Sequence, residues 1–153
     1  MAIYRPRPRR WPLALGTAVL GLGVGFGLGW GLRGSGGPDL AEAARRLQSS
    51  LAGAAGTLEV VEVEYRESVR DGQVVSEPEY GGARDALARS RERYLEAREA
   101  LLVLAPDAVR RADELFDDLE RLVADRAPPE ELAGTARELA RVLREAVGAV
   151  RPT

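Results

Sequence analysis

The stretch LEVVEVEYRESVRDGQVVSEPEY, residues 58–80, lies between two long helical patterns and decides how they meet. Asp71 and Gly72 at its centre form a turn dipeptide. Gly accepts a positive φ without a Cβ clash, and Asp can bond its own backbone. We therefore predict that the chain reverses direction between about Arg70 and Ser76.

The residues after this reversal are typical of a helix start. Ser76 can cap the helix with its hydroxyl, and Glu79 lies three residues further on to complete a capping box. Pro78 suits the first turn, where its missing N–H costs nothing. The sequence thus predicts a helical hairpin with its second helix starting at about Glu77.

Two phenols and two carboxylates gather near this hairpin tip. Tyr65 precedes the reversal and Tyr80 follows it, so an antiparallel pair should bring them within about one helical turn of the same level. Glu64 and Glu79 precede the two tyrosines and should flank the same seam. Oxygen ligands suit hard cations such as Ca²⁺, Mg²⁺ and Mn²⁺, and by the same logic ferric iron. The alternative is that both tyrosines belong to the core and that the acids form a solvated helix surface.

The same stretch resembles the extracytoplasmic helical domain associated with bacterial permeases of the high-affinity iron uptake family. The matching pattern lies within EYRESVRDGQVVSEPEY and consists of Tyr65, Val69, Gly72, Val74 or Val75, Glu79 and Tyr80. A weaker echo follows at residues 119–143, and the resemblance covers roughly residues 40–145. It departs from the family pattern at Gly81 and Gly82, where relatives usually carry larger residues. The resemblance implies a helical accessory domain of metal uptake, with iron as its cation and a permease or similar membrane protein as its partner.

Composition excludes several kinds of chemistry. The 153 residues include no Cys and no His, so there is no disulfide, thiolate zinc site, covalent haem attachment or histidine base. There is also no Lys, which removes the serine–lysine pair and the P-loop lysine. We therefore expect no enzyme.

Residues 11–32 are predicted to cross a membrane. This run of 22 residues carries no charge, and as a helix it would span about 33 Å, enough for a hydrocarbon core of about 30 Å. The basic tail of residues 1–10 places the N-terminus in the cytoplasm, and Trp11 and Trp30 fall near the two interfaces. The rest of the chain would lie outside the inner membrane, in the periplasm or its equivalent. A cleaved signal peptide is the alternative, with the small residues of the linker, residues 33–38, as its cleavage site.

Glycines alternate with larger residues in this span and form two small-residue ridges on nearly opposite faces of a helix. Such ridges let membrane helices approach closely, so we expect a span that packs against partner helices or against a second copy. An ordinary anchor with biased composition is the alternative. The helix-packing residues are Gly21, Gly23, Gly25, Gly27, Gly29 and Gly31.

Four amphipathic patterns follow in residues 39–153. Apolar seams at helical spacing predict a long first helix capped by Asp39, then helices at about 77–104, 106–125 and 129–150, separated at Pro106 and at Pro128-Pro129. The fold class is therefore all-α: an N-terminal single transmembrane helix followed by an up-down-up-down four-helix bundle. Because the first two helices are the longest, we expect the hairpin tip with Tyr65 and Tyr80 to project beyond the bundle.

The charge of the bundle limits its partners. The whole chain has a net charge of −2, but the outer domain alone carries 17 Arg against 24 acids, near −7. That balance disfavours nucleic acid or an anionic membrane surface as partner, and it suits cations or a basic protein face. We predict a non-catalytic accessory of metal uptake, with iron as the favoured cation and Glu64, Tyr65, Glu79 and Tyr80 as candidate ligands. The alternative is a scaffold subunit that docks into a larger membrane complex through its glycine-ridged helix.

Overall fold

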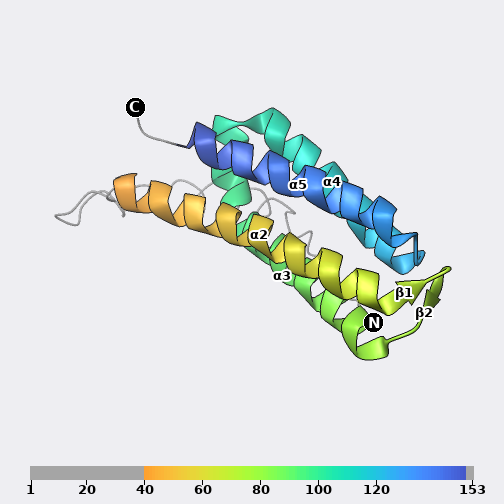
Figure 1. Cartoon of the computed structure of the whole chain (residues 1–153). Coiled ribbons are helices and arrows are strands. Elements are labelled where there is room, and N and C mark those ends of the chain that lie inside the picture. The colour runs from red at the N-terminus through yellow and green to blue at the C-terminus, as the bar shows by residue number, and fades with distance from the viewer. Residues whose placement is uncertain (1–39, 151–153) are drawn as a thin grey trace, which may run out of the picture. The chain divides into compact units, whose positions relative to one another are not determined.

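The computed structural model describes residues 40–150, which form four helices and one small hairpin (Figure 1). The elements are α2 (Leu40–Ser68), β1 (Val69–Arg70), β2 (Gln73–Val74), α3 (Glu77–Leu104), α4 (Pro106–Ala124) and α5 (Pro129–Ala149). None of the helices in this part of the chain combines the length and the apolar composition that a membrane crossing demands. The predicted anchor at residues 11–32, its glycine ridges and the flanking segments lie outside the described residues.

Each helix runs antiparallel to the next, as the paired side chains show. Between α2 and α3, Ser50 bonds Glu96 and Tyr65 stacks near Tyr80, so the partners move in opposite directions along the chain. The same holds between α2 and α5, where Glu59 pairs with Arg144 and Glu62 with Arg137. The predicted up-down-up-down order agrees with these pairs, and the predicted four-helix bundle is confirmed.

Small residues let α2 and α3 pack closely. Ala54, Ala83 and Ala86 are fully buried, and the buried Ser90 hydroxyl donates to the Ala54 carbonyl at 2.9 Å. This bond satisfies the buried Ser90 hydroxyl, and the short serine side chain still lets the two helices approach closely. The α2 helix also continues through Gly53 and Gly56, as the unbroken apolar seam predicts.

The reversal between α2 and α3 is a β-hairpin with a two-residue turn. Val69 pairs with Val74 and Arg70 with Gln73, while Asp71 and Gly72 have φ values of 50° and 73°. Two successive positive φ values define a type I′ turn, which matches the twist of paired strands. The predicted turn is therefore confirmed, but the short strands on either side of it were not predicted from sequence.

The start of α3 differs in one detail from its prediction. The helix begins at Glu77 with Ser76 at the N-cap position, but the Ser76 hydroxyl makes no capping hydrogen bond. Instead the backbone N–H groups of Val75 and Ser76 donate to the Ser68 carbonyl, at 2.7 and 3.4 Å. Hydrogen bonds to the end of α2 thus fix the backbone just before α3. The predicted capping box is wrong.

The C-terminus of α4 ends in a Schellman motif. The Ala127 N–H donates to the Leu122 carbonyl, and the Arg126 N–H donates to the Val123 carbonyl. Arg126 holds a φ of 53°, a left-handed conformation that normally favours glycine. The sequence hides this helix end, because no Gly or Asn marks it.

A polar and aromatic network joins α3 to α4. The Tyr94 hydroxyl donates to the Val109 carbonyl and to Asp113, and Arg98 forms a two-pronged ion pair with the same carboxylate. The Tyr94 ring lies 5.2 Å from that of Phe116, measured between centroids. Bonding from Arg98, ahead of that from Tyr94, holds the pKa of Asp113 below its usual range.

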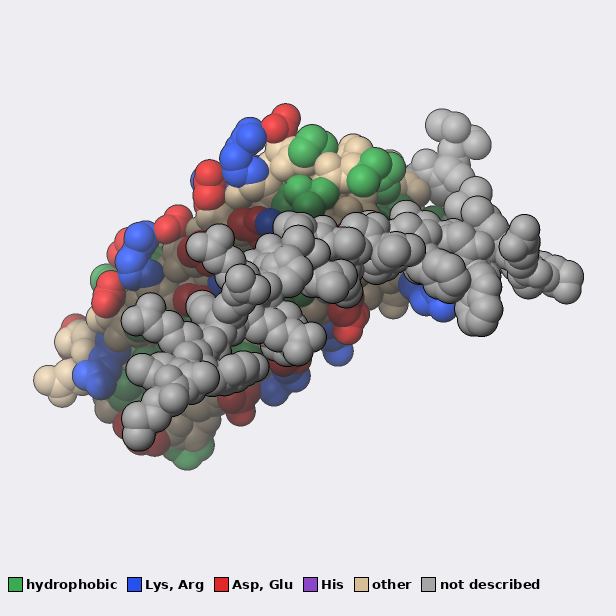
Figure 2. Space-filling model, turned by 180° about the vertical axis from the view of Figure 1, so that it is seen from behind, with side chains coloured by type: hydrophobic (Ala, Val, Ile, Leu, Met, Phe, Trp, Pro, Cys, Tyr) green, Lys and Arg blue, Asp and Glu red, His purple; other side chains and the backbone are tan. Residues whose placement is uncertain are grey.

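The outer surface is dominated by charged side chains, and Figure 2 shows acidic and basic groups side by side over the face seen there. Within α2, Glu42 pairs with Arg46 and Glu62 with Arg66. Exposed pairs of this kind contribute little to stability and mainly keep a helix soluble.

Replacing Arg126 by Gly should stabilise the bundle. The left-handed conformation costs a residue with a Cβ about 1 kcal/mol, and glycine removes that cost. We expect the free energy of unfolding, measured by urea denaturation, to rise by up to about 1 kcal/mol. The matched control is Arg110→Gly inside α4, which should lower it by a similar amount because glycine weakens a helix interior. A loss of stability in Arg126→Gly would contradict the assigned strain.

Removing the carboxylate of Asp113 should change how stability depends on pH. Because its pKa is lowered in the folded state, the group stabilises the fold above the unfolded pKa of about 4 and loses that contribution as the pH falls further. We expect Asp113→Asn to be less stable than the natural chain at neutral pH, with the difference shrinking below about pH 4. The control is Asp118→Asn, which loses only an exposed local pair with Arg121. A difference that is independent of pH would argue against the Arg98–Asp113 pair.

Candidate functional site

The candidate site is the seam between α2 and α3 just below the hairpin. As predicted, Tyr65 and Tyr80 meet there, with ring centroids 6.3 Å apart and ring planes inclined by 42°. Such a tilted pair is a favourable aromatic arrangement. The hairpin produces this meeting, because it returns the chain so that the end of α2 faces the start of α3.

Both tyrosine hydroxyls donate to backbone carbonyls at the α4–α5 connection. Tyr65 donates to the carbonyls of Ala127 at 2.8 Å and Leu122 at 3.3 Å, and Tyr80 donates to that of Val123 at 2.7 Å. The Leu122 and Val123 carbonyls also accept the N–H groups of the Schellman motif, so the phenols add a second donor to each and supply a donor to the Ala127 carbonyl. Burial, reinforced by the neighbouring Tyr80, raises the pKa of Tyr65 to about 12.

These bonds overturn the expectation that the tyrosines project beyond the bundle. Tyr65 is fully buried and lies at the level of the α4–α5 turn, not beyond it. The extra length of α2 lies at its other end: α2 begins beyond the end of α5 in Figure 1. The prediction failed because helix lengths alone do not say at which end neighbouring helices are flush.

The two acids of the seam make no ion pair within the described residues, and one of them is shielded from solvent. Among residues 40–150, neither Glu64 nor Glu79 forms an ion pair with an arginine. Glu79 Oε2 is shielded from solvent and has no hydrogen-bond partner there. Glu64 Oε2 lies over Gly82, where an added Cβ would approach it to 3.1 Å. Gly82 therefore leaves room for this carboxylate.

The seam offers carboxylate oxygens more readily than phenolate. A phenol ligates a metal best after losing its proton, and the raised pKa of Tyr65 opposes that loss. Deprotonation would also break the hydrogen bonds that both hydroxyls donate to carbonyls. Within the described range, no group of three or more acids is assembled for a metal ion. Glu64 and Glu79 are thus the oxygens of this seam that remain available.

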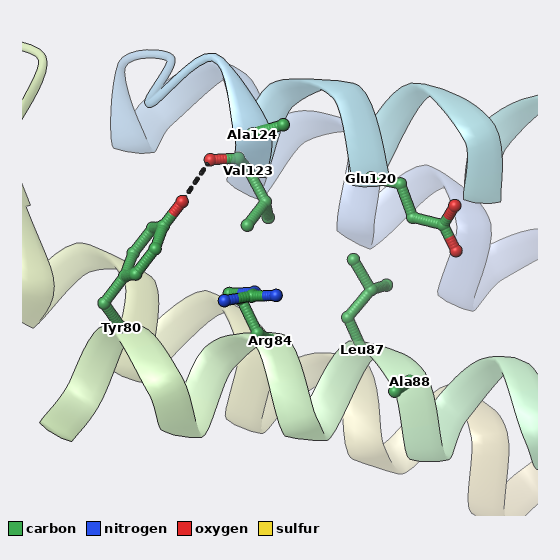
Figure 3. Close-up of a pocket in the computed structure, with 7 residues that line it drawn as sticks. All are labelled: Tyr80, Arg84, Leu87, Ala88, Glu120, Val123 and Ala124. Carbon is green, nitrogen blue, oxygen red and sulfur yellow. Dashed lines mark hydrogen bonds between the residues drawn. The ribbon is translucent and has the colours of Figure 1, made fainter. Parts of the chain in front are cut away.

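A groove between α3 and α4 adjoins the seam. It has a volume of about 360 Å³, and Figure 3 shows Tyr80 closing one end through its bond to Val123 while Glu120 stands toward the other. Glu120 is paired with Arg91. The lining residues are Tyr80, Arg84, Leu87, Ala88, Glu120, Val123 and Ala124. The mixed, open lining gives no set of converging polar groups that would define a ligand.

Sequence reasoning placed the four seam residues together but missed what the tyrosines bond. The signal was present, because a tyrosine on a buried seam needs a partner for its hydroxyl. The partners are backbone carbonyls about 43 to 62 positions away in the chain, so no motif reveals them.

Comparison with known proteins gives one clear match. The model of a family described as "Iron permease-associated 4-helix bundle domain" matches residues 39–151, most of the chain. No curated protein and no solved structure gives a significant match.

Removing either seam hydroxyl should loosen the attachment of α4 and α5. We expect Tyr65→Phe and Tyr80→Phe each to lower the free energy of unfolding by about 1 kcal/mol, because each loses a partly buried hydrogen bond between helices. Hydrogen exchange should show faster opening of residues 122–127 in both variants. Control Ser50→Ala, which loses an exposed bond to Glu96, should change stability far less. Unchanged protection at the α4–α5 turn would contradict the proposed attachment.

Proposed function

Because the chain belongs to the iron permease-associated four-helix bundle family, we propose that it is a membrane-anchored, extracytoplasmic accessory of iron uptake. The role is non-catalytic. The observation that carries it, beyond the family, is the Glu79 carboxylate oxygen that is shielded from solvent without a hydrogen-bond partner in the described part of the chain, with Glu64 lying over Gly82 one turn further along α3. A carboxylate oxygen that is shielded in this way, beside the tyrosine pair, is a natural place for a cation.

We place the cation between Glu64 and Glu79, with Tyr65 and Tyr80 as support for the seam. A buried carboxylate oxygen without a partner is costly, and a cation would remove that cost. Carboxylate ligands suit hard cations, among which ferric iron fits the family. The ring pair and its bonds to α4 would hold both helices in register and so preorganise the two acids.

The anchor follows from the sequence of residues 11–32, whose 22 uncharged residues match a hydrocarbon core. It would hold the acidic bundle outside the inner membrane, close to a permease in the same bilayer. The glycine ridges of this segment are the proposed contact with that partner or with a second copy.

The second candidate is a scaffold whose bundle binds no metal. It is favoured by the two tyrosine hydroxyls, which are fully engaged in holding α4 and α5. The role would then rest on the glycine-ridged segment docking into a larger membrane complex.

Cation titration of the full chain in mild detergent separates these two candidates. We expect binding of chelator-buffered Fe³⁺ that weakens by at least about tenfold in Glu64→Gln and in Glu79→Gln, because ligand oxygens and their immediate supports have effects of that size. Fe²⁺ under anaerobic conditions, Ca²⁺ and Mn²⁺ test selectivity. Gly82→Ala should also weaken binding, since the added methyl displaces the Glu64 carboxylate.

The matched controls are Glu67→Gln and Glu77→Gln, which remove exposed acids near the seam. Neither should change the affinity by more than a small factor if the seam is the site. Affinity that falls equally in all four glutamate variants would point to diffuse attraction by a negative surface. Absence of binding by the natural chain would leave the scaffold as the better account.

A further inference from the structure

Three successive apolar side chains are exposed where α3 ends. Leu102 is 43% exposed, Val103 84% and Leu104 55%. Single exposed apolar residues are ordinary, but a run of three on a surface rich in charge is not. Only Ala105 separates this corner, Leu102–Leu104, from the start of α4.

The corner lies at the end of the bundle where the chain enters α2. Ala43 and Ala100 line the same surface depression, so the last turn of α3 is level with the first turn of α2. Leu104 lies about one turn beyond Ala100. The hairpin and the Tyr65–Tyr80 pair occupy the opposite end.

The chain outside this bundle determines what the corner can face. Eight residue steps separate Leu32, the last residue of the apolar run, from Leu40, the first of α2. A chain of that length spans at most about 28 Å, and less when it is flexible. With the run in a bilayer, the corner stays within reach of the same membrane surface.

We propose that Leu102–Leu104 is a lipid contact that inserts shallowly into the interface of the bilayer holding the anchor. The inference rests on the anchor of the proposed function but is independent of the cation. Insertion would be shallow, because Glu99 lies one turn before the corner and Asp107, 87% exposed, follows it. The apolar tip is therefore bounded by charges that stay at the headgroup level.

Lipid fits the corner better than a protein partner does. A specific protein interface usually buries about 800 Å² on each side, far more than three side chains supply. A tethered contact needs little intrinsic affinity, because the tether turns it into an intramolecular event with a high effective concentration. The acidic bundle would also gain little from anionic headgroups, so the contact is apolar.

The test uses the full chain in lipid vesicles, with an environment-sensitive dye on a single introduced cysteine. The natural chain has no cysteine, so Val103→Cys and the matched control Val75→Cys each give one label. Val75, in the hairpin segment at the far end, is also an exposed valine, at 54%. We expect the dye at residue 103 to emit at shorter wavelength and to be quenched several-fold more by nitroxide lipids than the dye at residue 75. Leu104→Cys provides a second reporter should the first variant fold poorly.

Three outcomes of this experiment would contradict the lipid contact. Equal, water-like signals at both positions in vesicles that retain the chain would overturn the lipid contact alone. A shielded dye at residue 103 that nitroxide lipids do not quench would assign the corner to a protein partner and overturn it as well. If the chain did not float with the vesicles in a density gradient, it would not be anchored in the membrane. Both the lipid contact and the membrane part of the proposed function would then be wrong. The iron titration does not depend on the lipid contact, so it would still test the proposed cation site.

Discussion

The hydrogen bonds from two tyrosines to the end of α4 hold the two halves of this bundle together. Tyr65 comes from α2 and Tyr80 from α3, yet both donate to carbonyls at the α4–α5 connection. A carbonyl oxygen can accept two hydrogen bonds, and here the neighbouring helices add donors to the carbonyls of the Schellman motif and of Ala127. These bonds fix the level of the α4–α5 turn against the seam between α2 and α3.

The same bonds decide what the seam can do chemically. Phenols that donate to carbonyls are stabilised as phenols, so any effect of Tyr65 and Tyr80 on the proposed cation would come through the position of the helices and not through charge. The negative charge of the seam then belongs to Glu64 and Glu79 alone. Two carboxylates without an arginine leave ligand positions open, which suits a cation that is taken up and released better than one that is kept.

Much of the fold could be predicted because its signals are local. Prolines and apolar seams placed three helix starts correctly, at Glu77, Pro106 and Pro129, and Asp71-Gly72 placed the turn. The failures share a physical cause. The engagement of the tyrosine hydroxyls, the left-handed Arg126 and the level at which the helices are flush depend on contacts between residues far apart in the chain. The meeting of Tyr65 and Tyr80 was predicted correctly, and the role of the four seam residues as metal ligands stays a prediction.

The two ends of the bundle impose a geometry on any role in transport. Glu64 lies 24 residues after the start of α2, so the seam stands about 36 Å along the helix from the corner at Leu102–Leu104. With that corner at the membrane, a cation at the seam would be held well outside the bilayer and could not line the permeation path itself. A partner that receives it must either extend that far from the membrane or accept the ion after it dissociates. Both routes favour moderate affinity and fast release, which two carboxylates supply and a closed cage of ligands does not.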